Sequence, residues 1–346
     1  MKPLIVPFFI SHQGCPRHCV FCNQRTISGQ GGNLPGSDEM RAAIAAAALS
    51  GKGRRVEVAF YGGTFTSLPL ADQRRLLEPL QPLLASAEIA SVRLSTRPDA
   101  IDGETARFLC DHGVNTVELG VQSMDDRVLT AAGRGHVAAD TERAFAFLKK
   151  AGIAVGAQLM PGLPGDTGET TLESLRRVLA LGPAFLRIYP TVVVAGTELA
   201  ELWLCGRYSP LELDEAVSLC ARMLRVATRA GVPVIRIGLQ PTEELEAPGT
   251  ILAGPWHPAF RQLVEGDLWC ELLLRLAAGI PEGSEVKLAC APSRVSDVVG
   301  QRRRNLERLA AKRGVRVARV AATPACPPFD LEISYSGDTV AGSLFP

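Results

Sequence analysis

Three cysteines close to the N-terminus constrain this chain more than any other feature. Cys15, Cys19 and Cys22 are spaced C-x3-C-x2-C on one short loop. Three thiolates in this arrangement can bind three irons of a four-iron four-sulfur (4Fe-4S) cluster, because soft thiolate is the ligand that such clusters take. The fourth iron is then left without a protein ligand. An open coordination position is where a substrate can bind a metal, so the spacing predicts a reactive cluster.

Two other interpretations of the three cysteines stay open at this point. One is a structural zinc site with His12 or His18 as the fourth ligand, and the other is a set of ordinary buried thiols. Zinc sites usually draw on two ligand pairs separated along the chain, and the sequence shows no second pair. We expect the remaining cysteines to be ordinary buried residues: Cys110, Cys205, Cys220, Cys270, Cys290 and Cys326.

Length and composition limit the possible classes of protein. The chain has 346 residues and 47% hydrophobic content, enough for one large domain or for a core domain with an appendage. The formal net charge of +1 gives no general case for nucleic-acid binding, so any basic patch must be local. The apolar run after Met1 is too short for a signal peptide, and no stretch approaches the roughly 20 apolar residues of a membrane span. We therefore predict a cytoplasmic protein without membrane contact, where thiols stay reduced.

Short apolar runs alternate with helical patterns through the first 240 residues. The predicted strands are residues 4–10, 56–61, 92–95, 116–119, 153–160 and 185–189. The first predicted helix begins at residue 37, and the second spans residues 70–84. Six βα units in a row predict an α/β fold, a partial (β/α)6 barrel of the TIM type. Such folds carry their chemistry at the C-terminal ends of the strands.

Distinctive motifs follow these strand ends. Gly62-Gly63-Thr64 follows the second strand, where a double glycine lets backbone approach a ligand or merely closes the loop. The next two strands end in Ser95-Thr96-Arg97-Pro98-Asp99 and in Glu118-Leu119-Gly120-Val121-Gln122-Ser123. Later motifs are Gly133-Arg134-Gly135-His136, Met160-Pro161-Gly162-Leu163-Pro164-Gly165 and Arg187-Ile188-Tyr189-Pro190-Thr191.

The cysteine spacing is similar to that of the radical S-adenosylmethionine (SAM) enzymes. In that family SAM chelates the open iron, and its reductive cleavage yields a 5'-deoxyadenosyl radical that abstracts hydrogen from a substrate. The later motifs narrow the resemblance, because residues 3 to about 240 resemble the radical SAM half of the elongator catalytic subunit. Thr64 stands where the GGE-type motif of the radical SAM family usually has glutamate, and Ser95 stands where elongator-like sequences have glutamate. The acetyltransferase domain of that subunit has no counterpart in the unlike sequence that follows, so its chemistry does not carry over with the fold.

The resemblance implies a role for individual residues. Cys15, Cys19 and Cys22 would bind the 4Fe-4S cluster, and an external one-electron donor of the flavodoxin or ferredoxin type would reduce it. The residues implied for the SAM site are Phe21, Gly62, Gly63, Thr64, Ser95, Gln122, Arg134 and Gln158. Among them, Arg134 and Gln122 would address the carboxylate or ribose of SAM, since a guanidinium suits a carboxylate. Arg187 and Tyr189 end the sixth strand and are our candidates for catalytic contact with the substrate.

The rest of the chain predicts a small α+β domain. We place the barrel at residues 1–240, a linker at 241–255 and the C-terminal domain at 256–346. The domain is expected to contain a helix at 256–278, a strand at 285–290, two helices joined at Gly300, and a strand at 315–320.

A basic stretch distinguishes this C-terminal domain. Residues 294–319 contain nine basic residues against Asp297 and Glu307. The order helix, glycine loop, helix and strand is similar to a KH nucleic-acid module, although the GxxG signature is missing. Docking of RNA or tRNA through Arg302, Arg303 and Arg304 and a solvated basic surface are both consistent with this pattern.

These observations predict a radical SAM enzyme that cleaves SAM at a 4Fe-4S cluster to modify RNA, with tRNA the preferred substrate. One alternative is an enzyme acting on a porphyrin or another small metabolite, like the oxygen-independent coproporphyrinogen oxidases. A second alternative is a non-catalytic iron-sulfur protein that binds RNA or acts as a sensor.

Overall fold

The computed structural model describes residues 3–10, 15, 19–23, 33–51 and 53–345. His12 and His18, the ligands considered for a zinc site, lie outside the described residues. The described chain divides into two compact units. The first, the barrel unit, comprises residues up to 212 together with 232–256, and the second, the C-terminal unit, comprises 213–231 together with 257 onward.

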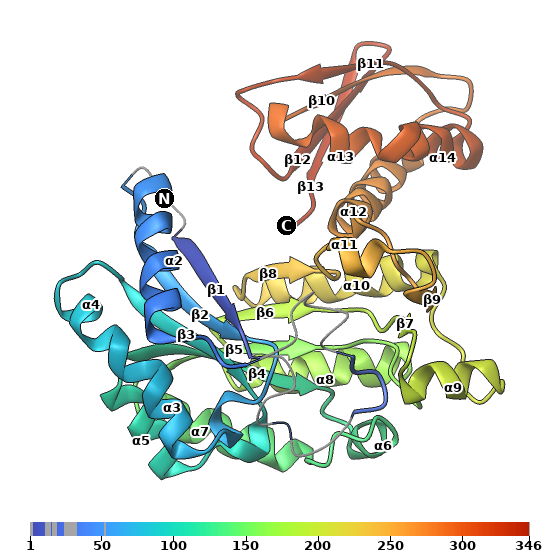
Figure 1. The fold of residues 1–346 in the computed structure, drawn as a ribbon. Helices are drawn as coiled ribbons and strands as arrows, with labels where there is room; N and C mark the ends of the chain where they lie inside the picture. The colour runs from blue at the N-terminus through green and yellow to red at the C-terminus, as the bar shows by residue number, and fades with distance from the viewer. Residues whose placement is uncertain (1–2, 11–14, 16–18, 24–32, 52, 346) are drawn as a thin grey trace. The chain divides into compact units, whose positions relative to one another are not determined.

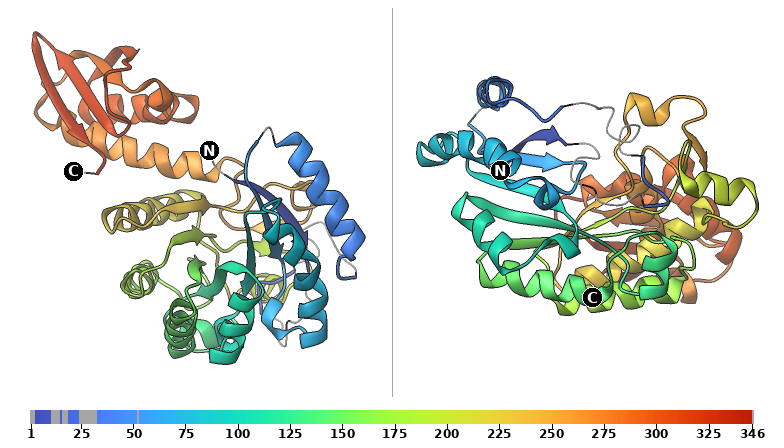
Figure 2. Two further views of the ribbon diagram at one scale, coloured as in Figure 1. Left: turned by 90° about the vertical axis from the view of Figure 1, so that its left-hand side faces the viewer. Right: turned by 60° about the horizontal axis from the view of Figure 1, so that its bottom comes forward.

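A seven-stranded parallel sheet forms the centre of the barrel unit (Figure 1). Its strands, in spatial order, are β1 (Leu4–Phe9), β2 (Val56–Tyr61), β3 (Ser91–Thr96), β4 (Val114–Gln122), β5 (Ala154–Leu159), β6 (Phe185–Ile188) and β8 (Val234–Ile237). The sheet is curled, with helices along its outer side (Figure 2). This confirms the predicted partial barrel of α/β type and adds β8 as a seventh strand.

Helices connect successive strands of the sheet. They are α2 (Ser37–Ser50), α3 (Leu70–Leu77), α4 (Gln81–Ala85), α5 (Gly103–Asp111), α6 (Asp126–Ala131), α7 (Ala138–Lys150), α8 (Gly168–Ala180) and α9 (Glu198–Leu204). The helix predicted at residues 70–84 is interrupted by a 3-10 turn at Glu78–Leu80. Pro79 and Pro82 account for the interruption, because proline lacks the N–H that a continuous helix needs.

Successive side chains along a strand alternate between the apolar core and the cavity. In β4, Val117 and Leu119 are buried apolar residues, whereas Glu118 between them lines a cavity on the inner side. The same alternation places Leu186 and Ile188 of β6 in the core and Arg187 in the cavity. Because successive side chains of a strand point to opposite faces, the outer face packs against helices and the inner face is free to be polar.

The segment 241–255, which the sequence predicts as a linker, contains regular structure within the barrel unit. It includes the helix α11 (Glu243–Glu246) and the strand β9 (Ile251–Ala253). β9 pairs antiparallel with β7 (Val193–Val194), which follows β6 in the chain.

The C-terminal unit packs helices against a four-stranded sheet. The sheet order is β11 (Arg316–Ala322), β10 (Glu285–Cys290), β12 (Asp330–Tyr335) and β13 (Asp338–Ser343). Its helices are α10 (Leu213–Arg229), α12 (Phe260–Leu276), α13 (Val295–Val299) and α14 (Arg304–Arg313). α12 contacts α10, α13, α14 and the sheet through buried residues such as Trp269 and Leu273. Gly300, with φ of 75°, separates α13 from the turn that leads into α14.

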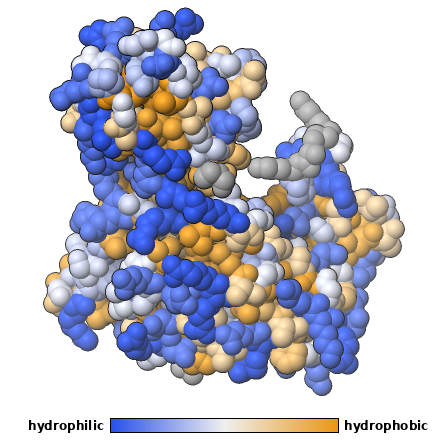
Figure 3. Space-filling view, turned by 180° about the vertical axis from the view of Figure 1, so that it is seen from behind, coloured by the Kyte–Doolittle hydropathy of each residue, from blue (hydrophilic) through white to orange (hydrophobic). Residues whose placement is uncertain are grey.

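No helix in the part of the chain that the structure describes is long and apolar enough to cross a membrane. Figure 3 shows hydrophilic side chains bordering smaller hydrophobic areas on one face of the molecule. Cys110 and Cys205 are exposed, so the expectation that they are ordinary buried residues was wrong. Their apolar character predicted burial, but both lie near helix ends. The other four cysteines outside the N-terminal loop are buried, as expected.

Candidate active site

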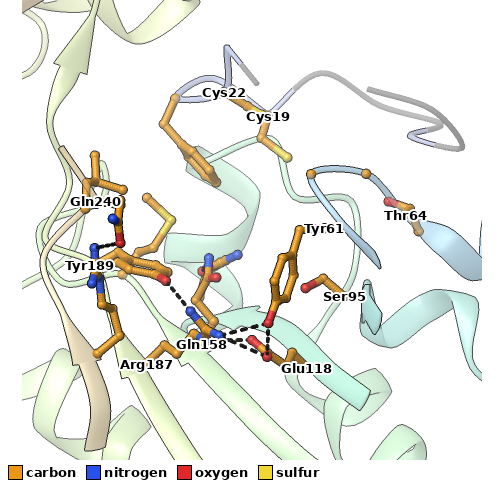
Figure 4. Close-up of a pocket in the computed structure, with 18 of the residues that line it drawn as sticks. Cys19, Cys22, Tyr61, Thr64, Ser95, Glu118, Gln158, Arg187, Tyr189 and Gln240 are labelled. Carbon is orange, nitrogen blue, oxygen red and sulfur yellow. Dashed lines mark hydrogen bonds and ion pairs between the residues drawn. The ribbon is translucent and has the colours of Figure 1, made fainter. Parts of the chain in front are cut away.

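A cavity of about 660 Å³ lies inside the curled sheet of the barrel unit. Residues at or just beyond the C-terminal ends of the parallel strands line it, as expected for this class of fold. Every residue that the sequence predicts for the site lines this one cavity: Cys15, Cys19, Cys22, Phe21, Gly62, Gly63, Thr64, Ser95, Gln122, Arg134, Gln158, Arg187 and Tyr189. Figure 4 shows Cys19 and Cys22 at one side and Glu118, Arg187 and Tyr189 at the other.

Two of the three thiols lie against polar partners. The Sγ atom of Cys15 is 3.3 Å from Oγ1 of Thr64, and Arg134 Nη1 donates to Sγ of Cys19 at 3.2 Å. Among the described residues, no three His, Cys, Asp or Glu side chains are arranged to hold one metal ion. In a 4Fe-4S cluster each thiolate binds a separate iron, and the three cysteines that line the cavity fit that donor set.

Besides its contact with Cys19, Arg134 makes two hydrogen bonds that hold it in place. Its Nη2 donates to the carbonyl oxygen of Gly120 at 2.6 Å, and its own carbonyl oxygen accepts from Arg97 Nη2. Arg97 in turn makes two hydrogen bonds to the carboxylate of Asp99, at 2.9 and 2.8 Å. A Cβ atom on Gly120 would lie 3.2 Å from Arg134 Nη2 and 3.0 Å from Nε2 of Gln122. Glycine at position 120 therefore leaves room for both side chains.

Gln122 has an unusual backbone conformation where β4 ends. Its φ of 68° lies in the left-handed region, which non-glycine residues rarely adopt. The ladder between β4 and β5 is irregular there, and Gln122 still accepts from the N–H of Met160. Nε2 of Gln158 donates to Oε1 of Gln122 at 3.2 Å. The two amides thus form a connected pair on the cavity wall, and strain of this kind is typical of functional sites.

A network centred on Glu118 forms the floor of the cavity (Figure 4). Oε1 of Glu118 accepts from the hydroxyl of Tyr61 at 3.2 Å, from Arg93 Nη1 at 3.1 Å and from Arg187 Nη2 at 3.0 Å. Arg187 Nε also lies 2.6 Å from Oε2 of Glu118, and its Nη1 donates to the hydroxyl of Tyr189 at 3.1 Å. The floor is therefore a set of mutually paired charges contributed by four strands.

A second carboxylate completes the charge balance below the floor. Glu57 forms an ion pair with Arg93 at 2.8 Å and accepts from the hydroxyl of Ser91. Glu57, Arg93, Glu118 and Arg187 have side chains with 6–17% exposure, so two buried carboxylates neutralise two buried guanidiniums. A buried charge is stable only when it is paired in this way.

Burial and neighbouring charges shift the pKa values of Tyr61 and Arg187 in the floor, and of the buried His136 outside it. Burial, reinforced by the Glu118 carboxylate, raises the pKa of Tyr61 well above its ordinary value. Burial opposes the charge of Arg187, but Tyr189, Glu118 and Tyr61 outweigh it and raise its pKa. Burial, and after it the charge of Arg134, lowers the pKa of His136. These groups therefore keep one protonation state near neutral pH, with His136 neutral.

The structure brings to the site several residues without a predicted role. Glu118 and Arg97 were visible only as letters within motifs, and Tyr61 only as the end of a strand. The alternation of Arg93 and Glu118 with buried apolar neighbours is the signal that could have revealed them. Arg236 and Gln240, beyond the sixth predicted strand, line the same cavity because β8 extends the sheet.

Comparisons with known proteins agree with this fold and site. The chain matches the radical SAM superfamily over residues 9–178 and the radical SAM C-terminal domain over residues 183–269. It belongs to the radical SAM superfamily and is therefore an enzyme of that class, one that implies a 4Fe-4S cluster and SAM as cofactors.

The chain is also similar to individual proteins. It is 31% identical over 185 residues to a tRNA uridine(34) acetyltransferase of Methanocaldococcus jannaschii, which covers 48% of this chain and 34% of that protein. The chain thus spans about a third of that relative, the radical SAM part. An uncharacterised protein of the same organism is 30% identical over 223 residues, 61% of this chain and 68% of its own length.

A solved structure shows the same fold. The Elp3 protein of Methanocaldococcus infernus, with residues 1–46 deleted, superposes with a TM-score of 0.60 at 24% identity. The match covers 77% of this chain and 62% of that one. This structure shows the fold. The chain is also 31% identical over 191 residues to elongator complex protein 3 of Saccharomyces cerevisiae, a match that covers 49% of this chain and 34% of that protein. Together, the family and sequence matches confirm the resemblance to the radical SAM half of the elongator catalytic subunit.

Proposed function

We propose that this chain reductively cleaves SAM and uses the resulting radical to modify RNA, with tRNA as the substrate. The observation that carries the proposal is the single cavity that joins Cys15, Cys19 and Cys22 to Gln122 and Arg134. The cluster, when bound, would supply the electron that cleaves SAM to the 5'-deoxyadenosyl radical. A flavodoxin or ferredoxin would reduce it, in a cytoplasmic setting.

The residues of the chain have distinct roles in this proposal. Arg134 offers a guanidinium to the carboxylate of SAM, and its contact with Sγ of Cys19 places that guanidinium beside the cluster ligands. The paired amides of Gln122 and Gln158 offer donors and acceptors to the ribose hydroxyls. The ring of Phe21 and the bare backbone of Gly62 and Gly63 leave room for the adenine and the amino group.

Arg187 and Tyr189 face the space that remains for the substrate. The hydroxyl of Tyr189 accepts from Arg187 Nη1 and keeps its own hydrogen available for a substrate oxygen or nitrogen. Because Arg187 is fixed by Glu118, the hydroxyl is held in one position. A positioned donor of this kind orients a substrate for hydrogen abstraction without moving itself.

Two observations support RNA as the substrate class. The first is the similarity of the barrel unit to an enzyme named for its action on tRNA uridine. The second is the turn before α14, where Arg302 and Arg303 are exposed and form no ion pair within the described residues. Arg304, which the sequence grouped with them, instead pairs with Asp214. We therefore assign RNA docking to Arg302 and Arg303 and treat Arg304 as a structural residue.

The variant Cys19→Ala tests the cluster and its chemistry. Anaerobically reconstituted wild-type protein should bind about four irons and form 5'-deoxyadenosine from SAM, whereas the variant should do neither. Cys110→Ala, which removes an exposed thiol from α5, is the matched control and should behave as wild type. A wild-type protein that holds one zinc and ignores SAM would overturn the proposal.

A salt titration of tRNA binding tests the docking surface. Phosphate contacts release counterions, so the removal of each arginine that binds a phosphate should reduce the slope of log affinity against log salt by about 0.7–0.9. The double variant Arg302→Gln/Arg303→Gln should bind more weakly and with a smaller slope. Arg74→Gln/Arg75→Gln removes two adjacent exposed arginines from α3 and should change neither. Equal affinities and slopes in all three proteins would exclude Arg302 and Arg303 from RNA docking.

A further inference from the structure

Arg236 occupies the last strand of the sheet and lines the cavity. In the parallel ladder between β6 and β8 it lies opposite Arg187. Neighbouring residues in register project from the same face of a sheet, so Arg236 points inward beside the floor network. Gln240, four residues later, lies near Tyr189 in Figure 4 and lines the cavity as well.

The charge of Arg236 is not balanced as the other charges of the cavity are. Arg187 is neutralised by Glu118, and Arg97 by Asp99. Arg134 contacts a thiol that becomes anionic on binding metal. Arg236 donates instead to the carbonyl oxygen of Gly238 and to Oε1 of Gln240, and no carboxylate within 4.0 Å pairs with it in the described ranges. A positive charge that faces a cavity without an internal counter-ion is complementary to an anion.

The hydrogen bond between the two side chains determines what they offer to a ligand. A guanidinium has only donors, so Gln240 must present its oxygen to Arg236 and turn its amide Nε2 away. Neither this Nε2 nor Nη1 of Arg236 has a hydrogen-bond partner within the described part of the chain. Two donors on adjacent side chains match the paired oxygens of a phosphate or a carboxylate. The three glutamates of α11 follow closely in sequence, but they are exposed and do not line the cavity.

We propose that Arg236 and Gln240 form an anion-binding site that anchors the substrate in the cavity. This inference rests on the proposed function, under which the anion is a phosphodiester next to the modified nucleotide. A carboxylate of a small metabolite would present the same chemistry, so the test includes both. The site would fix the substrate opposite the cluster loop and beside Tyr189. Arg236 would bind the RNA backbone, and the base would contact the residues of the floor.

The experiment measures ligand binding to full-length, cluster-loaded protein with SAM present, by isothermal titration calorimetry. The probes are the dinucleotide UpU, its uncharged methylphosphonate analogue, and benzene-1,3,5-tricarboxylate. The variant Arg236→Gln should raise the Kd for UpU by roughly 10- to 100-fold, because it removes a charge-assisted hydrogen bond, and leave the Kd for the uncharged analogue unchanged. Arg236→Lys should retain part of the affinity. Arg207→Gln, an exposed arginine of the same unit that does not line the cavity, should bind all probes as wild type does.

The outcomes separate this inference from the proposed function. If wild type binds the tricarboxylate but not UpU, and Arg236→Gln loses that binding, the anion site stands and the RNA proposal fails. If Arg236→Gln weakens UpU and its uncharged analogue equally, or weakens neither, the anion site is wrong. Should Arg236→Gln not fold, as judged by its iron content, Gln240→Leu removes the exposed amide alone and should weaken UpU in the same direction by a smaller factor.

Discussion

The arginines of the cavity floor in the barrel unit and Arg316 in the C-terminal unit are neutralised in different surroundings. In the barrel unit, Arg93 and Arg187 have side chains only 12% and 17% exposed, and the carboxylates that pair with them are 6% exposed. In the C-terminal unit, Arg316 is 81% exposed and its partner Glu285 is 56% exposed. The floor pairs are largely shielded from solvent, whereas the pair of Arg316 and Glu285 is exposed to it.

This difference teaches that a count of charges along the sequence does not give the charge of a surface. The basic stretch of residues 294–319 contains nine basic residues, yet several of them pair with acids from other elements. Arg304 pairs with Asp214 and Arg308 with Asp267, both outside the stretch. The unpaired positive charge is therefore smaller than the sequence indicates. Among the described residues of the stretch, it lies at Arg302, Arg303, Lys312, Arg313 and Arg319.

The largest difference between the two units should appear when one carboxylate is neutralised in each. We expect Glu118→Gln to lower the free energy of unfolding by about 3–5 kcal/mol, because Arg93 and Arg187 lose a shared buried partner. Glu285→Gln makes the same chemical change at a surface pair and should cost no more than about 1 kcal/mol. Urea unfolding followed by circular dichroism measures both. Equal losses would show that burial does not strengthen the floor network relative to the surface pair.

A smaller effect, on ligand affinity, should follow from removing Arg134. We expect Arg134→Ala to weaken SAM binding by about 1.5–3 kcal/mol, because the variant cannot make a charge-assisted hydrogen bond to the SAM carboxylate, while cluster iron content stays intact. Equilibrium binding of SAM and iron analysis give the two readouts. Arg319→Ala, an exposed residue of β11, is the control and should change neither. Unchanged SAM affinity in Arg134→Ala would mean that the family resemblance misplaces this residue.

The smallest effect should come from the surface pair between Asp214 and Arg304. The hydrogen bond from Arg304 lowers the pKa of Asp214 in the folded protein below its ordinary value. The ionised Asp214 carboxylate therefore stabilises the folded protein above a pH of about 3.9. This stabilisation is lost as the pH falls through the pKa of Asp214 in the folded state. We expect Asp214→Asn to cost less than about 1 kcal/mol at pH 7, because both groups are exposed. Thermal unfolding at pH 7 and near pH 3 checks this, and a cost that persists unchanged at the lower pH would contradict it.

The strand ends and the motifs on them were predictable from the sequence. The short apolar runs are local signals, and parallel strands bring their C-terminal ends together whatever the connecting helices contain. Residues as distant as Cys22 and Tyr189 could for that reason be placed in one site. The family motifs supplied the assignment of individual residues to SAM.

The charge network was not predictable in the same way. Glu118 and Arg187 are 69 positions apart, and Arg304 and Asp214 are 90 apart. No local pattern pairs such residues, because the pairing depends on strand order and register. The left-handed backbone at Gln122, Arg302 and Arg303 was also missed, since none of these is a residue type that signals it. β12 and β13 were not predicted because their alternation is short and half exposed.

The order of the parallel sheet, which runs from β1 to β8 without the two edges pairing, has a mechanical consequence. Residues of both edge strands, Phe9 and Arg236 among them, line the same cavity. In a closed barrel, a continuous ladder of hydrogen bonds sets the diameter. No backbone ladder joins the two edges among the described strands, so their separation is not fixed by backbone hydrogen bonds. We therefore expect the cavity to be able to widen through a change of sheet twist while every strand keeps its backbone partners.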